Sequence, residues 1–221
     1  MDVTKMMALA RPDNLAALRL QTDDYWHKMN SKQKDYYIQG SLSAGDALAA
    51  GFHAEEKVWS IQSLSEKYGI RVRKDTRELD TEYPDFSGRW QAERRIIYLH
   101  AGIAHRLIEL MQTFNRTITE EEVFRFLFLR AFFMPYAEEK GGFPSASLEP
   151  VSVRVLFTEK AFPVKMTDKA AAERFVDQVA GFPVPAGLLP FLVLIKNGQT
   201  NCQQVIDLLN GGKNHEDGHR D

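Results

Sequence analysis

The spacing of apolar residues divides the chain into helical stretches and a few short extended ones. Between His53 and Tyr68 apolar residues recur every three positions, and Gly69 follows as a residue that accepts the left-handed conformation of a helix end. This pattern predicts a helix there. Similar periodicity predicts further helices over residues 101–115, 119–139, 167–180 and 200–212. Alternation or short apolar runs predict strands at residues 70–73, 88–91, 95–100 and 151–157.

The first 50 residues mix aromatic and polar side chains in a spacing compatible with two short helices between Asp13 and Asp46. Gly40 and Gly45 are expected to separate and end them, and the aromatic residues are expected to pack against the main core. We therefore expect an N-terminal helical extension over residues 1–50, an α+β domain over 51–210 and a flexible polar tail over 211–221. The expected fold class is α+β, mostly helical with a small sheet.

The segment from residue 119 to 139 predicts the most buried helix of the chain. Thr119 and Glu122 form a capping-box pattern at its start. Apolar residues lie on opposite sides of the helical wheel, which is typical of a buried helix. Pro135 is expected to kink or end it near Phe133, because proline removes one backbone donor. Arg130 lies within the apolar stripe, where an unpaired charge is costly to bury. Its guanidinium is expected either to reach the surface or form a structural ion pair, or to line a pocket or a partner-binding face.

Composition and charge narrow the functional classes. The chain has 28 basic and 30 acidic side chains and a formal charge of −2, so it lacks a strong nucleic-acid signature. One cysteine, Cys202, excludes an internal disulfide. The apolar stretch 182–195 is short and contains three prolines, and the start lacks a signal-peptide run, so we expect no membrane span. A cytoplasmic protein with a protein partner is expected; neither the partner nor the oligomeric state follows from the sequence.

Histidines suggest two possible metal sites. His215, Glu216 and His219 spell the H-E-x-x-H pattern of zinc peptidases, which works only on a helix that turns both imidazoles toward one ion. This tail contains Gly218 and no apolar residue that could dock it, so a chance match on a solvated tail is expected. His100 and His105 are about 140° apart on a helix, so they converge only if His100 belongs to the preceding strand.

The order of the segments resembles the IrrE-like (ImmA/IrrE) group of zincin-fold metallopeptidases. The likeness covers about Ala54 to Pro190 and rests on EKYGIRV, ERRIIYL, TEEEVFRFLFLRAFFMPYAEE and DKAAAERFVDQVAGFPVP. The resemblance implies a zincin-like architecture in which the third of these segments carries the zinc-binding histidines and the catalytic glutamate. It also implies that the fourth supplies a glutamate as third ligand.

At those positions this chain departs from the family pattern. Arg130 and Met134 replace the two histidines, Ala131 replaces the catalytic glutamate, and Lys169 replaces the ligand glutamate. Arginine and lysine have no lone pair for a metal at neutral pH, and a thioether is a poor zinc ligand. The resemblance therefore implies that no metal cofactor is bound. It also suggests that Arg130 and Lys169 occupy the vacated pocket, with Glu173 as their carboxylate partner.

The expected function is that of a catalytically inactive metallopeptidase-like protein with a regulatory or protein-interaction role. One alternative is an active metal-dependent hydrolase or peptidase whose ligands the alignment misses. The other is a soluble α/β domain of unrelated function.

Overall fold

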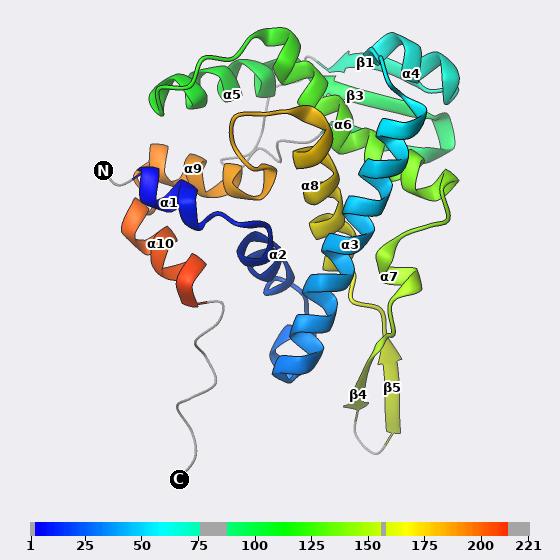
Figure 1. Cartoon of the computed structure of the whole chain (residues 1–221), viewed down its shortest axis with the longest axis vertical. Coiled ribbons are helices and arrows are strands. Elements are labelled where there is room, and N and C mark those ends of the chain that lie inside the picture. The colour runs from blue at the N-terminus through cyan, green and yellow to red at the C-terminus, as the bar shows by residue number, and fades with distance from the viewer. Residues whose placement is uncertain (1–2, 76–87, 156–157, 212–221) are drawn as a thin grey trace.

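The computed structural model describes residues 3–75, 88–155 and 158–211, which form a mostly helical α+β structure with two small sheets (Figure 1). A three-stranded sheet lies at one end of the molecule and a two-stranded hairpin projects from the other. The α-helices are α1 Val3–Leu9, α2 Pro12–Leu20, α3 Ser31–Glu55, α4 Ile61–Lys67, α5 Ala101–Thr113, α6 Glu120–Glu139, α7 Pro144–Ser147, α8 Met166–Ala180, α9 Leu189–Lys196 and α10 Cys202–Gly211. Short 3-10 turns are η1 Trp26–Lys28, η2 Ala92–Arg94 and η3 Ala186–Leu188. The mostly helical class with a small sheet is confirmed.

The larger sheet consists of three strands, all of which the sequence pattern predicts. These are β1 Arg71–Asp75, β2 Arg89–Gln91 and β3 Ile96–His100, in the order β1-β3-β2. The central strand β3 runs parallel to β1 and antiparallel to β2. Ile97 and Leu99 of β3 are buried in the main core, and α6 packs under this face of the sheet.

The smaller sheet pairs β4 Val151–Val155 with β5 Thr158–Phe162 in an antiparallel hairpin. The sequence predicts β4 from its alternating valines, but it gives no comparable signal for β5, whose first four residues are exposed. A second hydrophobic cluster joins the hairpin to the beginning of α3; its buried members are Leu20, Met29, Tyr37, Val151, Val153 and Val164. Tyr37 also donates its hydroxyl to the carbonyl of Glu149 at 2.8 Å.

Helix α6 is the enclosed centre of the main core. Eleven of its 20 residues are buried, and α5, α8 and the sheet pack around it. The predicted capping box is present, with the backbone N–H of Thr119 donating to Glu122 at 2.7 Å and Glu122 N–H donating back at 3.2 Å. Of the two effects expected of Pro135, a kink or an end near Phe133, the end is wrong, because α6 continues to Glu139. Pro135 removes a single backbone donor, whereas Tyr136 and Ala137 beyond it are fully buried, so their packing offsets the lost bond.

Helix α3 is one continuous element, so the two short helices predicted between Asp13 and Asp46 are wrong for this part. Gly40 and Gly45 lie inside it and allow close approach of other elements. A Cβ at Gly45 would lie 2.7 Å from the carbonyl oxygen of Ala171 on α8, and one at Gly40 would lie 2.7 Å from a methyl group of Leu148. The boundary expected at residue 50 falls within this helix.

The helix predicted over residues 53–68 is divided between two elements. Its first residues complete α3, and its last turns form α4, which ends at Lys67. Gly69 follows with φ +59°, as predicted, but Val58 lies outside the helices and is 94% exposed.

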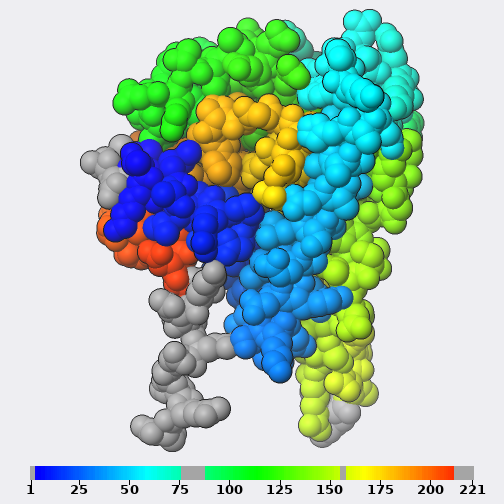
Figure 2. Space-filling model, in the orientation of Figure 1, coloured from blue at the N-terminus to red at the C-terminus, as the bar shows by residue number. Residues whose placement is uncertain are grey.

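The N-terminal helices share the main core with the rest of the chain. Helix α1 packs on α10, and α2 packs on α3 and α8. In the space-filling view, the N-terminal helices lie directly beside the C-terminal ones (Figure 2). Met6, Leu15 and Leu18 belong to the same hydrophobic cluster as Phe132 of α6. Removing the first 30 residues would therefore expose apolar side chains of the main core.

Helix α8 begins one residue before the predicted start at residue 167 and ends at Ala180, as predicted. Its first turn carries no side-chain cap of its own. Asp168 instead accepts hydrogen bonds from the N–H and hydroxyl of Ser145, at 2.8 and 2.6 Å, which ties α7 to α8. Gly181 closes the helix with φ +61°. No described helix is both long enough and apolar enough to cross a membrane.

Two glycines of α3 provide a matched test of this packing. Gly45→Ala is expected to lower the free energy of unfolding by about 1–3 kcal/mol, because its Cβ would collide with the α8 backbone. Gly51→Ala should instead raise it by about 0.5–1 kcal/mol, since alanine favours helix and only ordinary contact with Tyr136 is expected. Denaturant unfolding of both variants measures the difference. Equal effects of the two substitutions would contradict the close approach at Gly45.

Candidate functional site

Charged side chains gather where α2, α6 and α8 meet. We call Arg19, Arg130, Glu173 and Asp177 the charged cluster. Arg19 of α2 forms a salt bridge with the buried Glu173 of α8. Asp177, one helical turn later, accepts a hydrogen bond from the backbone N–H of Ala186 at 2.7 Å and so fixes the start of η3. The cluster therefore links three separate parts of the chain.

Aromatic contacts set the register between α6 and α8. Phe126, early in α6, stacks on Phe182, which lies just after α8, with ring centroids 4.2 Å apart. Phe133, later in α6, contacts Phe175 within α8 at 5.6 Å. Residues later in α6 thus meet residues earlier in α8, so the two helices run antiparallel. This register places Arg130 near Asp177. On α8, Asp177 lies eight residues after Lys169, which is about 12 Å along the helix axis.

Burial controls the protonation of Asp177. Desolvation raises the pKa of this carboxyl to about 7, and the neighbouring charge of Glu173 adds to the shift. The N–H of Ala186 and the charges of Arg130 and Arg174 oppose it. Because desolvation is the largest cause, the free energy needed to bury the negative charge of Asp177 is larger than the stabilisation that its hydrogen bond and the nearby arginines provide.

The positions that the resemblance aligns with zinc ligands lie in different environments. Arg130 is half-buried with its guanidinium carbon 5.7 Å from the centre of the Phe126 ring. Ala131 is buried, whereas Met134 is 39% exposed and Lys169 is exposed. Glu173 takes its salt bridge from Arg19 and not from the lysine one turn before it. Among the described residues, Lys169 forms no salt bridge with Glu173.

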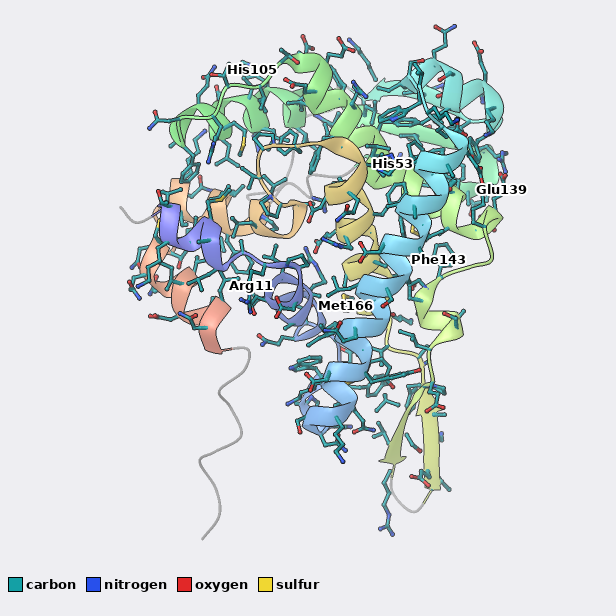
Figure 3. The ribbon with its side chains drawn as sticks, viewed as in Figure 1. Arg11, His53, His105, Glu139, Phe143 and Met166 are labelled. Atoms are coloured by element: carbon teal, nitrogen blue, oxygen red, sulfur yellow. The ribbon has the colours of Figure 1, made fainter. Side chains whose placement is uncertain are left out.

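The candidate histidines have separate structural roles. His100 ends β3, and its Nδ1 accepts a hydrogen bond from Gly102 N–H at 3.1 Å, which caps α5. His105 lies on the outer side of α5 beside Glu109, with Nε2 at 3.2 Å from the carboxylate (Figure 3). His53 lies on α3 and contacts the carbonyl of Gln178 at 3.2 Å. His215, Glu216 and His219 lie outside the described residues.

The described residues do not fit a zinc site. Among them, no group of three or more histidine, cysteine, aspartate or glutamate side chains is arranged to hold a metal ion. A hollow of about 10 Å³ next to Glu173 and Asp177 has room for about one water molecule. A larger hollow of about 510 Å³ lies between α1, α5 and α9. Neither is lined by a residue of α6.

Comparisons with family models, curated proteins and solved structures find no significant match to this chain. Its functional interpretation therefore rests on its own residues and contacts.

Two members of the charged cluster were missed from the sequence. Arg19 lies more than 150 positions from Glu173 in the chain, so local pattern gives no sign of their salt bridge. Asp177 did leave a signal, because it follows Glu173 by four residues on an otherwise apolar helix face. Two carboxylates on such a face predict buried partners.

Asp177→Asn is expected to raise the free energy of unfolding at pH 8 by about 1–3 kcal/mol. The pKa of this carboxyl is raised on folding, to about 7, so its contribution to stability is complete below about pH 4 and is lost as the pH rises through 7. Asparagine keeps an acceptor for Ala186 without the charge. Thermal and denaturant unfolding between pH 5 and 8 should therefore show a flatter pH dependence in the variant.

The exposed Asp207 on α10 offers the control, because Asp207→Asn removes a carboxylate without changing the buried cluster. An unchanged pH slope in Asp177→Asn, or an equal change in both variants, would contradict a buried carboxyl that titrates near neutrality.

Proposed function

We propose that this chain is a zincin-like, metallopeptidase-related protein that has no catalytic metal and acts by binding another protein in a regulatory role. The observation that supports this most strongly is the environment of α6. This helix corresponds, in the resemblance, to the one that carries the zinc-binding motif. Here it is enclosed by apolar side chains and presents a guanidinium, a methyl group and a thioether at the three motif positions.

A zinc hydrolase needs more than a helix in the right place. Three donor side chains must converge on one ion, and a fourth position must stay open for water or substrate. Arg130 instead puts a permanent positive charge at the position of the first ligand, which repels a divalent cation. Met134 is partly exposed, and between α6 and α8 the buried rings of Phe133 and Phe175 are in contact.

The order of elements also supports a zincin-like architecture. A helix, α4, precedes a strand; β3 leads into α5, and the acid-capped α6 is followed by α8. This is the order in which the quoted segments resemble the IrrE-like group. If this framework is present without its metal chemistry, its surfaces are the parts left to act, so protein binding is the function we favour.

Metal content separates this proposal from an active metal-dependent hydrolase. The full chain, tag-free and purified without chelator, is expected to contain less than about 0.1 zinc per molecule, because its described residues offer no tight site. Elemental analysis measures this directly. Chelator should leave its melting temperature unchanged, because no metal contributes to folding.

A variant with His215→Ala and His219→Ala is the control for zinc held loosely by the tail. Stoichiometric zinc in that variant, together with a lower melting temperature after chelation, would overturn the proposal. It would also favour a metal hydrolase with other ligands.

A further inference from the structure

The face of the three-stranded sheet that is turned away from α6 carries exposed arginines on both outer strands, on either side of the buried Ile96 and the half-buried Tyr98 of β3. Arg73 of β1 and Arg89 of β2 lie directly opposite Tyr98 of β3, from its two sides, so the three side chains share one face. Arg71, two residues before Arg73, lies on the same face. All three arginines are exposed. We call Arg71, Arg73, Arg89 and Tyr98 the arginine face.

Two of these arginines have positioning contacts, and none of the three has a salt bridge to another described residue. The guanidinium carbon of Arg89 lies 4.8 Å from the centre of the Tyr98 ring, and Arg71 donates to the carbonyl of Arg94 at 3.0 Å. Within the described parts of the chain, the salt bridges involve other cations, such as Arg19, Lys67 and Arg174. With a net charge of −2 for the whole chain, this cationic face is a local feature.

Strand β1 also forms one edge of the sheet. Its Arg71 N–H donates to the Arg95 carbonyl beside β3 at 2.9 Å. Alternation along the strand therefore turns the N–H and C=O groups of Val72 and Lys74 toward the outer edge. In the described residues no strand pairs with that edge. An edge that pairs with no described strand, beside a cationic face, can accept an additional strand.

We propose that β1 binds an extended acidic segment of a partner protein, which adds to its free edge as a further strand. Acidic side chains at alternate positions of that segment would lie beside Arg71 and Arg73, because both strands repeat every two residues. A guanidinium can hold a carboxylate through two parallel hydrogen bonds. The proposal rests on the proposed function only in that the partner is a protein.

The arrangement favours a peptide over a single-stranded nucleic acid. Binding of single strands relies on open aromatic rings on which bases stack. On this face the ring of Tyr98 is already covered by Arg89. The free backbone edge, in contrast, recognises another backbone in extended conformation.

Fluorescence anisotropy with the full chain tests the proposal. The probe is a fluorescein-labelled peptide of alternating valine and glutamate, and the control probe replaces each glutamate with glutamine. The glutamate probe is expected to bind saturably below about 1 mM, and at least about tenfold more tightly than the glutamine probe. Binding of the glutamate probe should weaken with added salt.

Charge-removing variants locate the site. Arg73→Gln should weaken binding about threefold, and Arg71→Gln combined with Arg73→Gln about tenfold, because each lost pair contributes modestly. Arg116→Gln, at an exposed arginine after α5, should leave the affinity unchanged. Melting temperatures of these variants check that each remains folded.

A second pair of variants tests whether the backbone edge takes part. Lys74→Pro removes an N–H that points away from β3, whereas Lys74→Gln removes only the charge. Proline is expected to weaken binding about tenfold, and glutamine at most about twofold.

Four results would overturn the proposal: no saturable binding up to about 1 mM, equal binding of both probes, equal binding by the proline and glutamine variants when both are folded, or unchanged binding after loss of Arg71 and Arg73. Tighter binding of a single-stranded oligothymidine, in competition with the peptide, would assign the face to nucleic acid instead. The zinc measurement is independent of these outcomes, so a metal-containing chain that still binds the probe would refute only the proposed function.

Discussion

The enclosure of α6 is the constraint on which the rest of the structure depends. A helix that is apolar on nearly every side must be covered on every side, and no single neighbour can do this. The sheet, α5 and α8 each cover part of it, while Phe52 of α3 reaches the rings of Phe132 and Tyr136. The close approach of α3 to α8 at Gly45 closes this arrangement.

This enclosure explains why charged residues near α6 are tied to distant parts of the chain. Glu173 and Asp177 lie on α8 beside a core that excludes water, where an unpaired carboxylate is costly. Arg19 reaches Glu173 from α2, so the N-terminal helices supply a charge as well as apolar surface. Asp177 has a backbone donor and nearby arginines, yet its pKa remains raised. Residues 1–50 are therefore part of the same structural unit as α6.

Local features of this fold could be predicted from the sequence because their causes are local. The capping box at Thr119, the left-handed Gly69 and Gly181, and the strands around Arg71 and Ile97 all follow from nearby residues. Features that depend on distant contacts could not. Glycine often ends a helix, so Gly45 was expected to do so. Its role is to let α3 approach Ala171 of α8, and that contact cannot be seen in the local sequence.

The same limit applies to the candidate site. The apolar pattern of α6 correctly indicated a buried helix that carries the charged Arg130. It did not indicate that the carboxylate of Asp177 lies near Arg130. The alignment suggested that Arg130 and Lys169 share a pocket, with Glu173, one turn after Lys169, as their carboxylate partner. The antiparallel register with α8 also places Asp177 near Arg130, and that register depends on aromatic contacts between segments that are distant in the sequence. The arginine face follows the same rule. The alternation at residues 70–73 predicted the strand, but it could not show that the strand lies at the edge of the sheet.

Amide hydrogen exchange of the full chain tests most directly whether α6 is a structural core and not a catalytic face. If α6 is enclosed, the amides from Phe126 to Phe133 should exchange only through global unfolding. Their opening free energies should then equal the free energy of unfolding obtained with denaturant. Opening free energies for these amides that lie about 3 kcal/mol or more below the global value would contradict this account, because they would show that α6 opens separately from the core.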